Sequence, residues 1–188
     1  MRAKDLFRLS IGLLMALAMA PIPVVAQVSP TGNYALEAQD FGVPPQQTLH
    51  LGEPHAPTPL SAPGTKTITT AELYERLAAR QPMTLLYVNE AQDGLAIAGS
   101  HWLYGAGRGQ TFDDAVQKRL AQKVGQLSAG NTEAPIVVFC FDPHCWLSYN
   151  VALRLAKAGY RNVSWYRGGR EAWKAAGLLL TRLDQEAW

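Results

Sequence analysis

The stretch that most constrains the fold covers residues 135–150 and has the sequence PIVVFCFDPHCWLSYN. Four apolar residues at 136–139 precede Cys140, and Cys145 follows after a short loop. A continuous apolar run of this kind is typical of a buried parallel strand, and the amphipathic segment after Cys145 is typical of a helix. Ligand sites of α/β proteins lie at the carboxyl ends of such strands. The sequence therefore predicts a cysteine-containing site at this edge of a sheet.

Strand and helix patterns alternate through residues 67–180, which we predict to be one domain. Strands are predicted at 85–88, 136–139 and 162–166, and helices at 70–80, 112–124, 146–158 and 170–176. Short, wholly apolar strands between helices predict an α/β domain with a parallel sheet flanked by helices on both faces.

Several residues are expected to define helix ends. Thr69 and Glu72 form a capping box, and Thr111 is expected to cap the second helix, which ends before Gly125. Arg154 lies toward the carboxyl end of the third helix, where positive charge suits the dipole. Residues 178–188 are expected to pack back on the domain, with 181–188 as its tail.

Residues 1–26 have the pattern of a signal peptide. Basic residues precede an apolar core at 11–20, and residues 24–26 offer the small-residue pattern of a cleavage site. The alternative, an uncleaved membrane anchor, is disfavoured because the apolar core is short and Pro21 and Pro23 follow it. We therefore expect a periplasmic or secreted protein without a stable membrane anchor.

Residues 27–66 are rich in proline and small polar residues, which argues against regular structure. This irregular N-terminal arm either wraps the domain or forms a partly disordered spacer. Scattered apolar residues favour wrapping.

Charge and compartment limit the partners and the state of the cysteines. The chain has 17 Lys and Arg against 15 Asp and Glu, and the predicted leader removes most of the basic excess. The near-neutral remainder does not predict a nucleic-acid partner. The two cysteines of an exported protein are expected to pair unless something reduces them.

The segment GSHWLYGAGRG, residues 99–109, contains glycines at alternating positions. Such a segment either directs backbone N–H groups at an anion or forms plain tight turns. Arg108 within it is either an anion clamp or a solvent-facing turn residue.

Together these features resemble the rhodanese domain. The resemblance rests on a strand ending in Cys140, a tight loop, a helix ending in Ala-Gly-Tyr at 158–160, and a Gly-Gly-x-x-x-Trp turn at 168–173. The Cys-Trp pair with Ser148 and Asn150, together with residues 99–109, is similar to a periplasmic rhodanese-like branch with a CxxCW motif. That branch is associated with pyrroloquinoline-quinone (PQQ)-dependent alcohol oxidation.

The resemblance implies a chemistry and partners. Cys140 occupies the position that carries persulfide in the family, so a small thiol or sulfur-donor molecule is the implied substrate. A quinoprotein dehydrogenase, or its electron acceptor, is the implied protein partner. No cofactor is expected.

The cysteine loop departs from the family pattern in two ways. Four residues separate Cys140 from Cys145 instead of two, and the loop has no Lys or Arg. Asp142 would repel an anionic donor by about 4 kcal/mol at 4 Å unless a cation such as Arg108 compensates. The ordinary thiosulfate reaction is therefore disfavoured.

The candidate catalytic residues are Cys140, Cys145 and His144. Loop N–H groups and the helix amino end would stabilise a Cys140 thiolate, while Cys145 would resolve its adduct and His144 would supply a proton or positive charge. The candidate substrate-binding residues are Arg108, Asp142, Trp146 and Ser148, with Trp146 alternatively a core residue. The other histidines, His50, His55 and His101, are expected to have no special role.

Three interpretations of the cysteine pair remain open. The first is sulfane-sulfur or thiol–disulfide chemistry. The second is an inert disulfide, although so short a loop contributes only about 2 kcal/mol. The third is a metal site of Cys140, His144 and Cys145, which lacks an evident fourth ligand, and we expect no metal. At the level of function, a non-catalytic binding module is the alternative to an enzyme.

Overall fold

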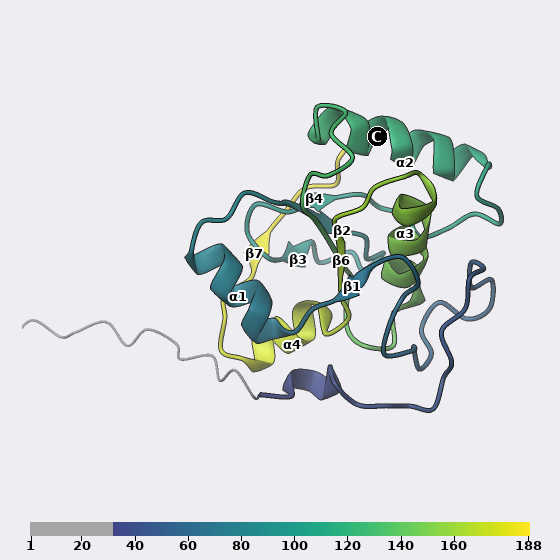
Figure 1. Ribbon diagram of the computed structural model, residues 1–188. Coiled ribbons are helices and arrows are strands. Elements are labelled where there is room, and N and C mark those ends of the chain that lie inside the picture. The colour runs from purple at the N-terminus through teal and green to yellow at the C-terminus, as the bar shows by residue number, and fades with distance from the viewer. Residues whose placement is uncertain (1–31) are drawn as a thin grey trace, which may run out of the picture.

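A five-stranded parallel sheet forms the centre of the computed structural model, which describes residues 32–188 (Figure 1). The predicted signal peptide lies outside the described residues. The sheet order is β1-β6-β5-β2-β4, and every neighbouring pair is parallel. Its strands are β1 (Lys66–Thr67), β2 (Thr84–Tyr87), β4 (His101–Trp102), β5 (Ile136–Phe139) and β6 (Val163–Tyr166). The short strands β3 (Leu95–Ala96) and β7 (Thr181–Arg182) form a separate antiparallel pair.

Helices cover both faces of the sheet because side chains of successive strand residues point to opposite sides (Figure 1). Val137 and Phe139 pack in the core that includes α1 (Thr70–Ala78) and α4 (Gly169–Ala175). The alternate residues of β5 pack in the core that includes α2 (Ala115–Leu127) and α3 (Trp146–Lys157). The predicted α/β fold, a single domain with a helix-flanked parallel sheet, is therefore confirmed.

Several predicted boundaries are confirmed. Thr69 and Glu72 form the reciprocal capping box that begins α1, and Gly159 follows α3 with a φ of +93°. The tail packs back on the domain, since β7 pairs with β3 and Glu186 N donates to Trp102 O.

The predicted bounds of the second helix are wrong at both ends. Asp114, not Thr111, is the N-cap of α2, and its carboxylate accepts from Gln117 N at 2.8 Å. The helix continues through Gly125 because glycine costs only about 1 kcal/mol in a helix interior. Arg154 has a different role from the one expected, since its side chain is fully buried and binds Asp114 instead of serving only the helix dipole.

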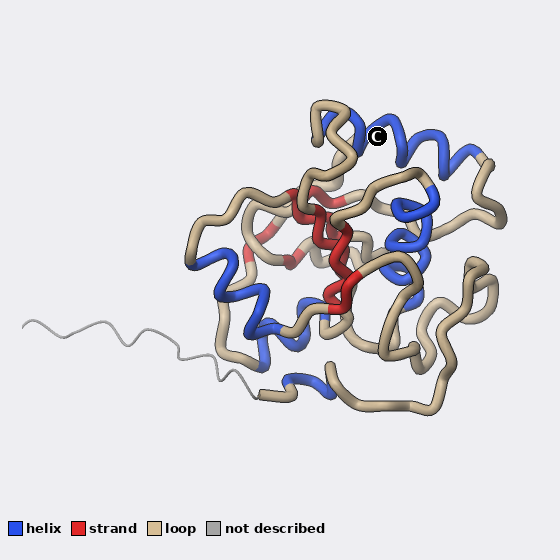
Figure 2. The backbone as a smooth tube through the Cα atoms, in the orientation of Figure 1, coloured by secondary structure: helices blue, strands red, loops and turns tan. Residues whose placement is uncertain are grey.

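The described part of the proline-rich arm wraps the domain, as one of the two interpretations predicted. After the short helix η1 (Tyr34–Leu36), it is irregular and runs beside α3 (Figure 2). Tyr149 Oη, on α3, accepts from Gln46 N at 2.8 Å. Asn150 bonds both backbone groups of His50, at 2.8 and 3.0 Å. Because these bonds satisfy arm backbone groups, the arm is held without strands or helices of its own.

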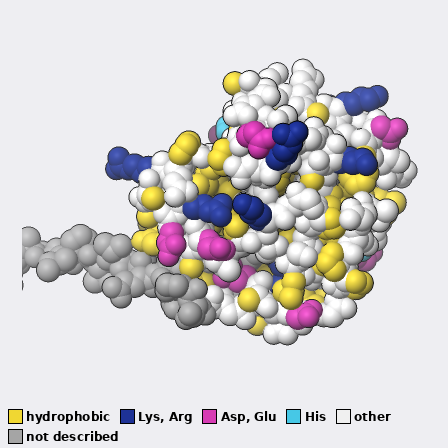
Figure 3. Space-filling view, viewed as in Figure 1, with side chains coloured by type: hydrophobic (Ala, Val, Ile, Leu, Met, Phe, Trp, Pro, Cys, Tyr) yellow, Lys and Arg dark blue, Asp and Glu magenta, His cyan; other side chains and the backbone are white. Residues whose placement is uncertain are grey.

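The surface shown in Figure 3 has acidic and basic side chains interspersed, without a field of one sign. Among the described residues, no helix has both the length and the apolar character needed to cross a membrane.

Candidate functional site

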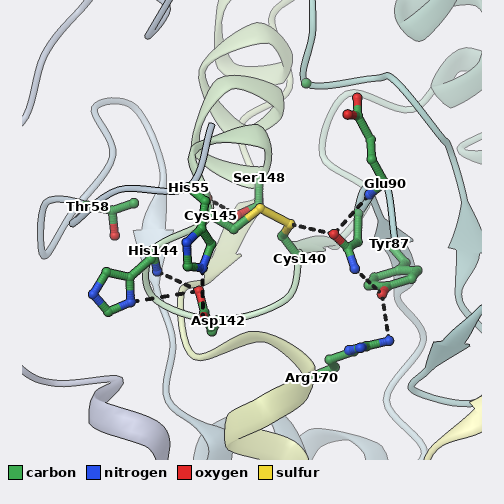
Figure 4. Close-up of a disulfide and its surroundings, with 12 residues drawn as sticks. His55, Thr58, Tyr87, Glu90, Cys140, Asp142, His144, Cys145, Ser148 and Arg170 are labelled. Carbon is green, nitrogen blue, oxygen red and sulfur yellow. Dashed lines mark hydrogen bonds and ion pairs between the residues drawn. A yellow bond between two sulfur atoms is a disulfide. The ribbon is translucent and has the colours of Figure 1, made fainter. Parts of the chain in front are cut away.

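The two cysteines form a disulfide between the end of β5 and the start of α3 (Figure 4). Cys140 follows the last residue of β5, and Cys145 is the N-cap residue of α3. Their Cα atoms are 6.1 Å apart, and only 1% of Cys140 and 5% of Cys145 is exposed. The predicted position of Cys140 at the carboxyl edge of the sheet is therefore where the structure places it, and Cys145 lies in bonding contact with it.

Three backbone N–H groups in and directly after the cysteine loop have acceptors within the protein. His144 N donates to Asp142 Oδ1 at 2.8 Å, and Cys145 N donates to Asp142 O at 3.1 Å. Trp146 N donates to Pro54 O of the arm at 2.9 Å. In this disulfide form, these three N–H groups stabilise the loop and its contact with the arm instead of a bound anion.

The environments of the two sulfurs differ. Cys145 caps α3 without any side-chain hydrogen bond, so a thiolate formed there on reduction would lie at the positive end of the helix dipole. Cys140 Sγ lies 3.8 Å from Asn89 Oδ1, which would accept the proton of a Cys140 thiol. The structure thus places Cys145, the predicted resolving residue, at the start of α3 and Cys140 beside Asn89.

Asp142 lies between two histidines beside the disulfide (Figure 4). Its Oδ2 is 3.2 Å from Nε2 of His55, and its Oδ1 is 3.9 Å from Nδ1 of His144. This contact was not expected, since His55 was predicted to have no special role. Nothing in the sequence near His55 indicated this contact, because the contact depends on the path that the arm takes across the loop.

Arg108 and Trp146 share a pocket that lies apart from the sulfurs. The pocket measures about 290 Å³ and is also lined by His50, Leu51, Gly52 and Pro54 of the arm, whereas neither cysteine lines it. The Arg108 guanidinium bonds Glu90 through Nε at 2.8 Å and a terminal nitrogen at 2.6 Å. This pairing raises the pKa of Arg108. The cation considered as compensation for Asp142 is therefore bonded to Glu90 instead.

Trp146 and Ser148 are held within the fold. Trp146 is 3% exposed and stacks on the His50 ring with centroids 4.0 Å apart, which favours the core interpretation. Ser148 Oγ donates to Cys145 O at 3.2 Å and accepts from Trp165 Nε1 at 3.0 Å. Ser148 therefore links the start of α3 to β6.

The two backbone N–H groups that directly follow the glycine-rich segment bind an anion that belongs to the protein. Gln110 N and Thr111 N donate to Asp114 Oδ2 at 2.8 and 3.1 Å. A Cβ at Gly107 would lie 2.5 Å from the Leu147 backbone, so glycine allows this segment to pack closely on α3.

Thr58 and Arg167, neither of them predicted as a site residue, fix the cysteine loop to the arm. Thr58 Oγ1 donates to Pro143 O at 2.5 Å and accepts from Arg167 Nε at 3.1 Å. Arg167 is only 1% exposed. The only sequence signal was its place directly after a predicted strand, where the carboxyl edge of the sheet begins.

Reducing the Cys140–Cys145 bond is expected to lower the free energy of unfolding by only about 2 kcal/mol, because the loop that it closes is short. Urea unfolding with and without a reductant, followed by tryptophan fluorescence, measures the difference. A variant with serine at both positions should not respond to the reductant. A loss above about 4 kcal/mol, the value typical of a long loop, would contradict this expectation and indicate a structural staple.

Comparisons with known proteins agree with this fold. The family model for the rhodanese-like domain matches residues 69–176. None of the curated proteins compared with the chain gives a significant match.

Solved structures with a related fold have low sequence identity. A thiosulfate sulfurtransferase from Pseudomonas aeruginosa is 21% identical, over 64% of this chain and 21% of that chain, with a TM-score of 0.48. A polysulfide-sulfur transferase homodimer from Wolinella succinogenes is 16% identical, over 64% of this chain and 81% of that chain, with a TM-score of 0.45. A full-length protein from Lactobacillus plantarum is 21% identical, over 62% and 88%, with a TM-score of 0.48. The match thus spans about a fifth of the Pseudomonas chain.

Proposed function

Because this chain belongs to the rhodanese-like domain family, we propose that its reduced Cys140 accepts sulfane sulfur and that Cys145 resolves the resulting persulfide. The observation that carries the proposal is the bond between the two sulfurs. It places a second thiol within reach of the residue at the family's sulfur-carrying position. The product of the resolving step is then the disulfide itself.

The reaction has two steps and a return. The Cys140 thiolate takes the outer sulfur from a small-molecule persulfide, which leaves as a thiolate, and becomes Cys140–S–SH. The Cys145 thiolate then attacks the inner sulfur, which forms the disulfide and expels HS⁻. The sulfane sulfur gains the two electrons that the cysteine pair loses. Two molecules of a small thiol restore the dithiol and leave as their disulfide.

Asp142 bears on the choice of donor. Its carboxylate lies in the loop with 17% of its side chain exposed, and the Arg108 cation is bonded to Glu90. A small-thiol persulfide brings less negative charge to this site than the thiosulfate dianion does, so it suffers less repulsion. We therefore propose small-thiol persulfides as donors in preference to thiosulfate.

Intact-protein mass spectrometry tests the cysteine roles. Cys145→Ser, reduced and then treated with a small-thiol persulfide, should retain an added sulfur on Cys140 because no thiol resolves it. The wild type should instead release sulfide and return to the disulfide. Cys140→Ser is the matched control and should release no sulfide. Absence of an adduct on Cys140 in Cys145→Ser would refute the proposed reaction.

We further propose that the protein works in the periplasm in support of PQQ-dependent alcohol oxidation. The support is the signal-peptide pattern of residues 1–26 and the sequence resemblance carried by Cys145, Trp146, Ser148 and Asn150. Fractionation of cells that produce the full chain tests the location. Recovery of the uncleaved chain from the cytoplasm would contradict it.

A second candidate function, a non-catalytic binding module for a quinoprotein dehydrogenase or its electron acceptor, is favoured by the burial of both sulfurs. Growth on alcohol separates the two functions. If deletion abolishes growth and Cys140→Ser does not, the protein acts by binding. Equal loss in both strains supports the sulfur chemistry.

A further inference from the structure

Three potential metal ligands meet beside the disulfide. They are His55 from the arm and Asp142 and His144 from the cysteine loop, and Figure 4 shows the side chains turned toward one another. One ligand atom from each lies within 4.8 Å of the other two. The shortest separation, between His55 Nε2 and Asp142 Oδ2, is 3.2 Å.

These separations are close to what a tetrahedral ion needs. Bonds of about 2.0–2.2 Å place the ligand atoms of a tetrahedral zinc site about 3.3–3.6 Å apart. The two histidine–aspartate separations, 3.2 Å from His55 to Oδ2 and 3.9 Å from His144 to Oδ1, lie near that value, with one carboxylate oxygen facing each imidazole. The imidazoles of His55 and His144 are 64% and 31% exposed, so small side-chain rotations would bring all three atoms onto one ion.

The backbone already holds the three residues in place. Ala56 N donates to His144 O at 2.8 Å and Trp146 N donates to Pro54 O at 2.9 Å, so bonds to the loop lie on both sides of His55. His144 N also fixes the Asp142 carboxylate at 2.8 Å. Binding an ion would therefore order little additional chain, which favours affinity.

We propose that His55, Asp142 and His144 form a site for a divalent transition-metal ion, with zinc as the ion of reference. Two imidazole nitrogens and a carboxylate suit zinc or copper, whereas calcium and magnesium prefer oxygen alone. Water would take the fourth position of such an ion. This donor set differs from the one considered from sequence, because the structure joins the Cys140 and Cys145 sulfurs to each other.

Such an ion would bridge the arm and the cysteine loop. His55 belongs to one segment and the other two ligands to the second, so zinc adds a cross-link directly beside the disulfide. Zinc is therefore expected to slow reduction of the disulfide by a small thiol. Binding itself does not depend on the sulfur reaction, and it is measured on the oxidised protein.

Isothermal titration calorimetry with Zn²⁺ tests the site on untagged, oxidised protein, checked by thiol titration to contain no free cysteine. We expect one Zn²⁺ per chain with a dissociation constant in the micromolar range or below. Removal of an outer-shell partner alone costs about 10–100-fold in metal affinity, so His55→Ala and His144→Ala should each weaken binding by at least about 100-fold.

His101→Gln is the matched control, because His101 also pairs with a carboxylate, that of Glu186, at 2.6 Å. The other partner of Glu186 is Lys123, a cation, where Asp142 has a second histidine. The His101→Gln variant should bind Zn²⁺ like the wild type. Imidazole NMR of the wild type is a second measurement that needs no folded variant of the site. Zn²⁺ should shift the signals of His55 and His144 and leave that of His101 in place.

Three results would overturn the site. They are no binding up to millimolar Zn²⁺, wild-type affinity in His55→Ala, and an equal loss of affinity in His101→Gln.

Discussion

Replacing Arg154 by methionine is expected to lower the free energy of unfolding by about 3–5 kcal/mol, the range found when one partner of a buried ion pair is removed. The Arg154 side chain has no exposed surface. Its guanidinium bonds both Asp114 oxygens, at 3.2 and 3.0 Å, and the carbonyl oxygens of Thr111 and Arg108, at 2.8 and 2.7 Å. Methionine fills much of the volume but donates to none of these acceptors and leaves the partly buried Asp114 carboxylate without its cation.

The loss should depend on pH because Asp114 belongs to the same network. Burial alone would raise the pKa of Asp114, but hydrogen bonds from Gln117 N, Arg154 and Thr111 N together lower it below the usual 3.8. A lowered pKa in the folded state contributes stability above the unfolded pKa of about 3.9, and this contribution is lost as the pH falls through the folded pKa. The difference between wild type and Arg154→Met should therefore shrink below about pH 4.

Urea unfolding at neutral and acidic pH measures both effects, with Arg161→Met as the matched control. Arg161 bonds Glu133 at 2.8 Å, but the two side chains are 76% and 58% exposed. An exposed pair contributes about 0–1 kcal/mol, so the control should remain near wild type. Similar losses in both variants would contradict the assigned role of Arg154.

Strands β2, β5 and β6 and the place of Cys140 were predictable because they depend on local patterns, whereas the two-residue strands β1 and β4 were not predicted. The apolar run at 136–139 specifies a buried strand wherever it occurs, and Thr69 with Glu72 begins a helix through contacts only three residues apart. The helix after Cys145 is likewise set by its own periodicity. For these elements, the structure favoured by neighbouring residues is also the one found in the complete fold.

The surroundings of the disulfide were not predictable because they depend on long-range contacts. His55 reaches Asp142 across 87 residues of sequence, and Arg167 reaches Thr58 across 109. Neither partner carries a local signal, since a histidine or threonine in a proline-rich segment is ordinary. The role predicted for Arg154 was incomplete for the same reason. The sequence correctly placed Arg154 near the end of a helix, but it gave no sign of the partner Asp114, which lies 40 residues away.

Replacing Arg167 by methionine is expected to release the arm from the cysteine loop and to speed reduction of the disulfide by about ten- to a hundredfold. The guanidinium donates to Glu37 O at 2.7 Å, to Thr58 O at 3.0 Å and to Thr58 Oγ1 at 3.1 Å. Thr58 Oγ1 in turn donates to Pro143 O, inside the loop. Loss of one such charged hydrogen bond costs about 1.5–3 kcal/mol. This cost raises the population of the locally opened arm by about ten- to a hundredfold.

The measurement is the rate of disulfide reduction by a small thiol, trapped by alkylation, together with limited proteolysis of the arm. Circular dichroism in the same buffer confirms that the domain remains folded. Leu51→Ala is the control, because this arm residue is 64% exposed and its removal should change neither rate. Thr58→Val removes only the hydroxyl link and should give a smaller acceleration than Arg167→Met.

An arm that is cut faster while the disulfide is reduced at the wild-type rate would show that the arm does not control access to the sulfurs. Faster reduction in step with faster proteolysis would identify arm opening as the step that admits thiols to Cys140 and Cys145.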